Sequence, residues 1–341
     1  MLPRIAADYR ALLWIGMAIT LVSIPYLSYS WLVFYLFPLN IYFAIAAGVI
    51  AHNHNHCPVF KSWRMNRLFS HVLTFFYGYP TFVWVAVHNG NHHKHVNRAG
   101  DASITWRYNN DHTAWTAWTF FFVSAYHQGV PIKAFIQKAK TKNPKLYRRI
   151  VAQYVIWLGT WAAVWLTGVT LYGLRRGTVM WLLGVGLPSL MSLWVIMFFN
   201  YEQHVHTDPW SEHNHSRNFV GPIVNFLLFN NGYHGIHHEK PALHWSKLPA
   251  AHQQIADKID PELCQTNVAW YFIRQFALAP FWPQYGSQQI GRAPFDTPDG
   301  GPLDLTADEV ELGEAGSNTY MVTARPAAVP VRTNRETPVE A

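Results

Sequence analysis

The sequence ALLWIGMAITLVSIPYLSYSWLVFYLFPLNIYFAIAAGVIA, residues 11–51, contains no charged side chain. A helix crosses the hydrocarbon core of a bilayer with about 20 apolar residues, so this stretch is long enough for two crossings with a break near Ser28, Tyr29 and Ser30. A cleaved signal peptide would have a shorter apolar core followed by polar sequence, and this stretch stays apolar instead. We therefore predict a helical hairpin with spans at residues 11–29 and 31–51.

A second apolar stretch, residues 151–201, is interrupted only by Arg175 and Arg176. It predicts another hairpin, with spans at residues 151–173 and 177–200. The whole composition agrees, because only 13% of the 341 residues are charged while 16% are aromatic, whereas about a quarter of a soluble globular chain is charged. We expect an all-α integral membrane protein with four transmembrane helices in two hairpins.

Composition also excludes several other classes of protein. Cys57 and Cys264 are the only cysteines, which is too few for a disulfide framework or a four-thiolate iron–sulfur or zinc site. The net charge of +7 suggests an anionic partner, but no basic stretch has the motif or the aromatic interleaving of a nucleic-acid reader. We therefore expect contact with anionic membrane lipid and no binding of nucleic acid.

Histidines gather in short clusters near the ends of the predicted spans. Within each cluster, polar side chains recur three or four residues apart and so share one face of a helix. Neutral imidazole is a good ligand for iron, copper and zinc, and the nine clustered imidazoles at such spacing exceed the four ligands of one tetrahedral zinc. Two metal ions are therefore predicted. The clusters are AHNHNHCP (residues 51–58), HNGNHHKH (88–95), NYEQH (200–204) and YHGIHHEKP (233–241).

Two further apolar stretches, residues 68–87 and 113–132, are also long enough to span a bilayer. If either crossed alone, histidine clusters on its two sides would face opposite compartments and could not form one site. We therefore place both in the membrane interface or as re-entrant segments, which leaves all the clusters in one helical cap. Many Lys and Arg residues between the hairpins, against only Asp101 and Asp111, put this cap and both termini in the cytoplasm.

The composition changes after residue 280. Pro, Gly, Thr and scattered acids replace the apolar pattern there, which is typical of a mobile segment. We predict one membrane domain over residues 1–280, without internal repeats, and a mobile C-terminal tail over residues 281–341.

The histidine clusters resemble those of the membrane fatty acid desaturase superfamily, whose members share boxes of the forms HxxxH, HxxHH or HxxxHH, and HxxHH. The corresponding segments here are HNHNH (residues 52–56), HNGNHH (88–93) and HGIHH (234–238). NYEQH (200–204) is similar to an NxxxH element of the acyl-CoA branch. The resemblance covers roughly residues 52–249.

This resemblance implies a metal site of two non-haem irons held by nine histidines, with Asn200 acting through a water molecule. The second box has a three-residue gap, so the identity of its first ligand is less defined, and His54 and His95 are extra histidines that could substitute. The implied ligands are His52, His56, His88, His92, His93, His204, His234, His237 and His238.

The resemblance also implies a fatty-acyl desaturase, which uses O2 as co-substrate to introduce a double bond into an acyl chain. The acyl group would be free or carried by CoA, a carrier protein or a lipid. The chain has no cytochrome b5 module, flavin fingerprint or ferredoxin-like cysteine set, so the electrons would come from a separate protein of the ferredoxin, rubredoxin or cytochrome b5 type.

Two alternatives stay open at this point. A hydroxylase, ketolase, alkane monooxygenase or acetylenase of the same superfamily would use the same metal site, and we favour desaturation because NYEQH and HGIHHEKP, followed by HWSKLP (residues 244–249), look most like desaturases. A non-enzymatic membrane metal-binding protein is the more distant alternative. Such a carrier would need ionisable groups along its spans, which are absent from the four apolar stretches.

Two sets of side chains near the clusters suggest further roles. Glu202 and Glu239 either orient a ligand histidine by accepting its second N–H or are ordinary solvated charges, and we weigh the two equally. Five aromatic residues are candidates for the wall of a substrate channel, although each alone is more typical of a lipid-facing or interfacial position. They are Tyr79, Phe82, Trp84, Trp106 and Phe199.

Overall fold

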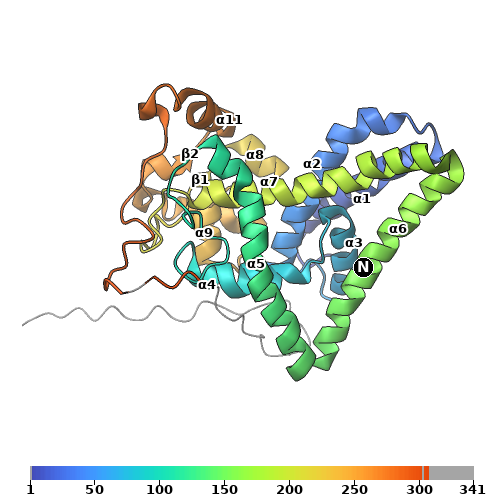
Figure 1. Ribbon diagram of the computed structural model, residues 1–341, viewed down its shortest axis with the longest axis horizontal. Helices are drawn as coiled ribbons and strands as arrows, with labels where there is room; N and C mark the ends of the chain where they lie inside the picture. Colours follow the sequence, from blue (N-terminus) through green and yellow to red (C-terminus); the bar gives the residue numbers. More distant parts are fainter. Residues whose placement is uncertain (1, 302, 307–341) are drawn as a thin grey trace, which may run out of the picture.

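The computed structural model describes residues 2–301 and 303–306, and the regular structure in that range is almost entirely helical (Figure 1). The long helices are α1 (Asp8–Leu27), α2 (Leu32–His56), α3 (Trp63–Tyr77), α5 (Ala114–Lys142), α6 (Pro144–Trp181) and α7 (Leu187–His204). The short ones are α4 (His93–His95), α8 (Pro222–Leu227), α9 (His234–Glu239), α10 (Leu248–Gln253) and α11 (Val268–Phe272).

Shorter elements complete the described structure. The π-helical turns are η1 (Trp84–His92), η2 (Leu182–Gly186) and η6 (Ile273–Leu278). The 3-10 turns are η3 (Trp245–Lys247), η4 (Ala256–Lys258), η5 (Pro261–Leu263) and η7 (Pro283–Tyr285). Strands β1 (Asn218–Phe219) and β2 (Cys264–Gln265) pair in parallel.

Three helical segments are long and apolar enough to cross a bilayer: Asp8–Leu27, Leu32–His56 and Pro144–His204. The prediction of a mostly helical protein of membrane type is confirmed. The helices α1 and α2 form the first predicted hairpin, with the break at Ser28.

The second hairpin lies within one long helical segment that reverses its direction partway along. Gly173 has a non-helical backbone (φ 79°, ψ 162°), and a Cβ added at Gly177 would overlap the backbone of Gly168. Nine residues of a straight helix rise about 13.5 Å, so this contact requires a reversal between the two glycines. The ring nitrogen of Trp165 also donates a hydrogen bond to Thr178 across the turn (3.0 Å). The two arms meet at the right-hand end of the molecule in Figure 1.

The apolar stretch at residues 68–87 does not form one helix. Gly78, with φ +86°, ends α3, and η1 begins only at Trp84. Phe69, Leu73 and Phe76 of α3 are buried in the main apolar core. Most of this stretch is therefore covered by protein.

Helix α5 contains the other stretch, residues 113–132, and runs steeply across α7 in Figure 1. Thr113 caps it by accepting a hydrogen bond from the backbone N–H of Thr116 (3.2 Å). One side of α5 exposes large apolar side chains at helical spacing, which are Trp115, Trp118, Phe122, Tyr126 and Val130. Such a stripe is typical of a helix that lies in the membrane interface.

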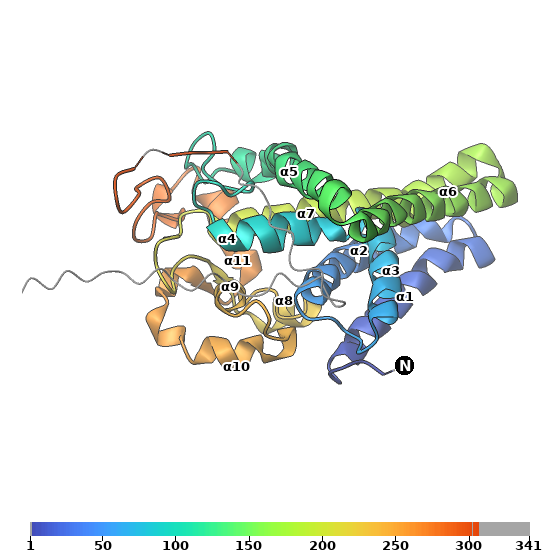
Figure 2. The same cartoon turned by 90° about the horizontal axis from the view of Figure 1, so that it is seen from below.

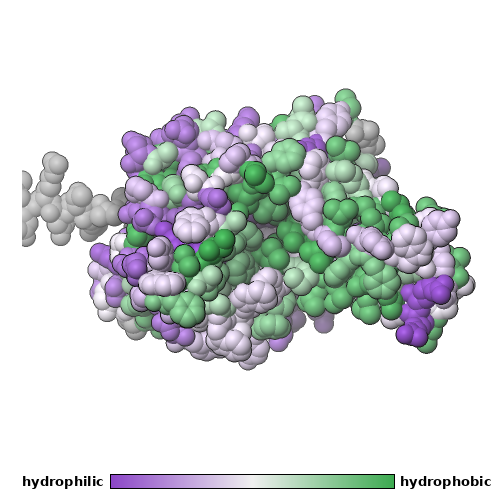
Figure 3. Space-filling view, turned by 90° about the horizontal axis from the view of Figure 1, so that it is seen from above, coloured by the Kyte–Doolittle hydropathy of each residue, from purple (hydrophilic) through white to green (hydrophobic). Residues whose placement is uncertain are grey.

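The remaining elements form the cap at the end of α2 and α7, opposite the tips of the two hairpins (Figure 2). On the face shown in Figure 3, hydrophobic residues cover most of the hairpin half apart from a hydrophilic patch at its far end, whereas hydrophilic residues gather over the cap. The segment after residue 280 begins by packing on this cap: Ser287 pairs with His112 (2.6 Å), and Phe295 contacts Trp106. Residues 307–341 of the expected tail lie outside the described residues.

Candidate metal centre

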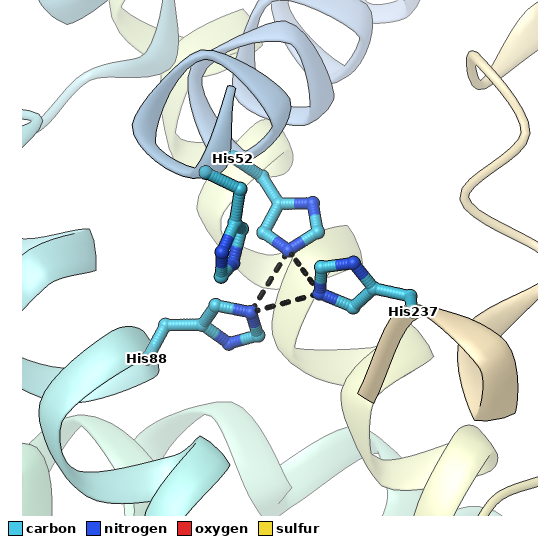
Figure 4. A group of neighbouring side chains, drawn as sticks. His52, His88 and His237 are labelled. Atoms are coloured by element: carbon cyan, nitrogen blue, oxygen red, sulfur yellow. Dashed lines mark hydrogen bonds between the residues drawn. The ribbon is translucent and has the colours of Figure 1, made fainter. Parts of the chain in front are cut away.

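Four buried histidines from three distant parts of the chain form the first metal-binding group. His52 and His56 lie one turn apart at the C-terminal end of α2, His88 lies in η1, and His237 lies in α9. The Nε2 atom of His52 is 2.8 Å from that of His88 and 3.0 Å from that of His237 (Figure 4). One ligand nitrogen from each of the four side chains lies within 4.8 Å of the others.

Four other buried histidines form the second group: His92, His204, His234 and His238. The Nε2 atom of His204, at the end of α7, is 3.1 Å from that of His92 and 2.9 Å from that of His234. His238 Nε2 is 3.0 Å from His234 Nε2. This group meets the same 4.8 Å criterion as the first.

The groups do not follow the sequence boxes, because two boxes each contribute to both. His88 belongs to the first group and His92 to the second, although their rings stack with centroids 5.3 Å apart, as expected for side chains on one helical face. The turn that carries them is π-helical, an element that is rare and frequent at functional sites. In α9, His237 joins the first group while His234 and His238 join the second.

The ninth predicted ligand, His93, lies between the groups. Its Nε2 atom is 3.0 Å from that of His88 and 3.2 Å from that of His237, and its ring centroid is 4.4 Å from that of His238. Asn200 lies one helical turn before His204, and its buried side-chain nitrogen makes no hydrogen bond within the described residues. The structure thus brings together all nine histidines, with Asn200 close by.

Electrostatics favours the neutral form of imidazole that a metal needs. Burial, reinforced by the neighbouring imidazoles, lowers the pKa of five cap histidines well below the ordinary value. These are His88, His93, His234, His237 and His238. They therefore present lone pairs at neutral pH.

Asp101 orients one of the clustered histidines, a role that the sequence analysis did not find. Its fully buried carboxylate accepts a hydrogen bond from Nδ1 of His92 (2.7 Å) and others from Ser103 and from the backbone of Asn97. Burial alone would raise the pKa of Asp101, but the nearby His92 and these donors outweigh it and hold that pKa well below its usual range. The available signal was that Asp101 is the only acid among residues 57–110.

The loop that holds Asp101 has an unusual backbone. Val96 and Asn97 have positive φ values of 48° and 62°, which is costly for a β-branched residue such as valine. The backbone N–H of Val96 bonds to the carbonyl of His92 (2.6 Å), and the side chain of Asn97 donates to the carbonyl of His204 (2.9 Å). The hydrogen bond of Asn97 therefore connects this strained loop, which follows the second box, to the end of α7.

The two glutamates considered in the sequence analysis contact other histidines. Glu202 pairs with His112 (3.0 Å) and accepts a hydrogen bond from Tyr271 (3.0 Å), while Glu239 pairs with His213 (2.9 Å). His54 also has a structural role, since its Nδ1 accepts from the backbone of Val59 (3.2 Å) and its Nε2 lies 3.2 Å from a carbonyl oxygen. His95 belongs to neither metal-binding group.

An apolar cavity of about 790 Å³, including its open end, reaches both groups. His52 and His88 of the first group line it together with His92 and His234 of the second. Another part of the wall consists of apolar residues of α2 and α7, including Ile45, Val49, Val195 and Ile196. Among the residues that the structure describes, no Lys, Arg, Asp or Glu lines this cavity.

Two of the five aromatic candidates for a channel wall, Trp84 and Phe199, line this cavity. The other three are engaged elsewhere. Phe82 stacks on Phe135, the hydroxyl of Tyr79 pairs with that of Tyr154, and Trp106 donates to a backbone carbonyl. Polar residues that the sequence analysis missed, among them Ser103, Gln128, Gln203 and Asn231, also line the cavity.

The residues present fit two metal ions. Nitrogens bound to one ion at about 2.1 Å lie at most about 4.2 Å apart, and small side-chain adjustments within each 4.8 Å group satisfy this limit. All eight donors are imidazoles, which suit iron, copper, nickel and zinc. The geometry therefore supports a buried dimetal centre beside an apolar cavity.

Comparison with known proteins agrees with this arrangement. A sequence model described as "Fatty acid desaturase" matches residues 29–282, which is more than half of the chain and includes all the histidine clusters. No curated protein and no solved structure matches the chain. Two buried histidine groups beside an apolar cavity, together with this match, show that the chain belongs to the fatty acid desaturase family.

Proposed function

We propose that this enzyme is an O2-dependent fatty-acyl desaturase, which introduces a double bond into an acyl chain. The single observation that carries the proposal is the cavity, because it is apolar along α2 and α7 and reaches histidines of both metal-binding groups. If one end of an acyl chain lay in this cavity between α2 and α7, the chain would run alongside both metal-binding groups. The absence of charged residues from the described lining suits a hydrocarbon.

We assign the two metals as iron, held by the nine predicted histidines with Asn200 placed to hold a water molecule. Bound irons would supply the O2-dependent oxidation that removes hydrogen from an unactivated C–H bond. The protein contributes neutral imidazoles, and Asp101 fixes the ring of His92 so that its Nε2 lone pair faces His204. The apolar wall excludes water and holds the chain in register with the metals.

For the membrane arrangement we propose four spans in two hairpins, with the metal centre and both termini on the cytoplasmic side. The fold-back at Gly173 supports four spans. The basic character of residues 57–149 supports the orientation. Electrons would come from a separate donor protein.

The test is a product analysis with the purified, iron-loaded protein, labelled acyl substrates and an electron donor. Desaturation removes two hydrogen atoms, so the product is two mass units lighter than the substrate, and about two irons per chain should be present. A product sixteen mass units heavier would replace the proposal with hydroxylation. One labile zinc, no iron and no product would indicate a metal-binding protein without this activity.

A further inference from the structure

Three arginines gather on one indole ring at the surface, away from the metal centre. The guanidinium carbon (Cζ) of Arg67 lies 4.9 Å from the ring centroid of Trp63, and those of Arg64 and Arg149 lie at 5.7 and 5.9 Å. Trp63, Arg64 and Arg67 belong to the start of α3, whereas Arg149 belongs to the start of α6. We call these four residues the arginine cluster.

The described structure supplies no anion to this cluster. Residues 57–100 and 112–201 contain no Asp or Glu, and none of the three arginines forms an ion pair with an acid in the described ranges. Like charges repel, and cations near a helix N-terminus also oppose the helix dipole. Both helices carry arginine in their first two turns. A bound anion would therefore reduce both the repulsion between the arginines and their unfavourable interaction with the helix dipoles.

The position of the arginine cluster relative to the membrane surface indicates which kind of anion would bind to it. Arg149 lies two residues before the charge-free segment 151–173, and Trp63 is 42% exposed, as is typical of tryptophan at a membrane–water boundary. Helix α5, which ends just before α6, exposes its aromatic stripe. The cluster therefore lies at the level of lipid headgroups, and guanidinium matches phosphate oxygens with paired hydrogen bonds.

We propose that the arginine cluster binds the phosphate of an anionic phospholipid. The lipid holds the N-terminal ends of α3 and α6 together at the membrane surface. This site is separate from the metal centre and does not depend on which reaction the enzyme performs.

The test uses native mass spectrometry of the purified full chain in detergent, titrated with phosphatidylglycerol or phosphatidylcholine. The wild-type protein should retain phosphatidylglycerol preferentially. Arg67→Gln and Arg149→Gln should each weaken that binding about tenfold, since each removes charge-assisted hydrogen bonds. Arg148→Gln is the matched control: it removes the same charge from the adjacent, exposed position of α6, which does not lie over Trp63, and should change binding less than twofold. Metal content and the elution volume should stay the same in all variants.

A second measurement needs no variant. Phosphatidylglycerol should slow amide hydrogen exchange at residues 62–67 and 144–149 of the wild-type protein, and phosphatidylcholine should not. Equal binding of the two lipids, or an equal loss in Arg148→Gln and Arg149→Gln, would overturn the proposal. So would displacement of the lipid by millimolar inorganic phosphate, or lipid binding that survives both arginine variants while donor-driven turnover falls, which would make the cluster a protein dock.

Discussion

Each histidine of the two metal-binding groups is buried against other imidazoles, so the groups work as sets of neutral donors. Residue spacing predicted that histidines of one box share a helical face, because three- and four-residue intervals place side chains on one side of a helix. It did not predict how they divide. The rings of His88 and His92 stack with centroids 5.3 Å apart, yet the two residues belong to different groups. Their partners come from α2, α7 and α9, and the spacing within one box does not record those partners.

His237→Ala should lower the metal content from about two ions per chain to about one and abolish turnover, because the first group loses one of its four donors. Metal analysis and product formation measure the two effects. His213→Ala is the matched control, since His213 pairs with Glu239 near the surface, and it should keep two metals and full activity. A His237→Ala protein with two metals and normal turnover would disprove the assignment.

Asp101→Asn should weaken metal binding by about 10- to 100-fold, which is the usual effect of removing a carboxylate that orients a ligand histidine. The side chain keeps its shape but loses the charge that stabilises the Nδ1–H of His92. Competition with a chelator measures the affinity. Glu239→Gln makes the same chemical change at a histidine outside both groups, and its metal affinity should match that of the wild-type protein.

At the scale of elements, the apolar stretches of the sequence predicted the hairpin α1–α2 and a second hairpin near residue 175. The observed reversal is at Gly173, close to the predicted turn at Arg175 and Arg176. The sequence could not predict the break of residues 68–87 at Gly78. An apolar stretch indicates that a segment avoids water, but it does not distinguish a segment covered by lipid from one covered by protein. The placement of this stretch and of residues 113–132 in the membrane interface or as re-entrant segments stays a prediction.

Gly177→Val should destabilise the protein by about 1–3 kcal/mol, a typical cost of overpacking, because its side chain would overlap the backbone of Gly168. The overlapping atoms belong to the backbone of Gly168, so no change of side-chain rotamer can relieve the overlap. The midpoint temperature of unfolding, followed by size-exclusion chromatography after heating, should fall clearly. Gly159→Ala is the control, because Gly159 lies in the same helix and a Cβ added there meets open space. If its midpoint temperature fell equally, the close contact at the fold-back would not be the cause of the destabilisation.

At the scale of the whole molecule, the metal-free protein should lose stability as the pH falls below about 6.5. Burial lowers the pKa of the cap histidines in the folded state below their ordinary value of 6.5. The unfolded chain therefore takes up more protons at acid pH, and the free energy of unfolding decreases. Above that pH it should be nearly constant.

Thermal unfolding of chelator-treated protein between pH 5.5 and 8 measures this dependence. The His237→Ala variant should show a shallower slope, because it has one buried imidazole fewer to protonate on unfolding. A midpoint that rises as the pH falls would contradict the argument.

The family and the gathering of the histidine boxes could be predicted from the sequence because both depend on short local motifs. The residues that contact these histidines from elsewhere in the chain could not be predicted in the same way. Asp101 reaches His92 through a strained loop, and the cavity joins residues of α2, α5, α7 and η1 that are far apart in the chain. Such long-range contacts leave no periodic signal.

The division of the boxes between the two groups has a consequence for biosynthesis. The first group needs His237 in addition to His52, His56 and His88, and the second needs His234 and His238 in addition to His92 and His204. During translation, a nascent chain that has inserted its first hairpin therefore holds only an incomplete set of donors for either ion. Full coordination must therefore await the emergence of α9 from the ribosome, so both metal-binding groups are completed only late in synthesis.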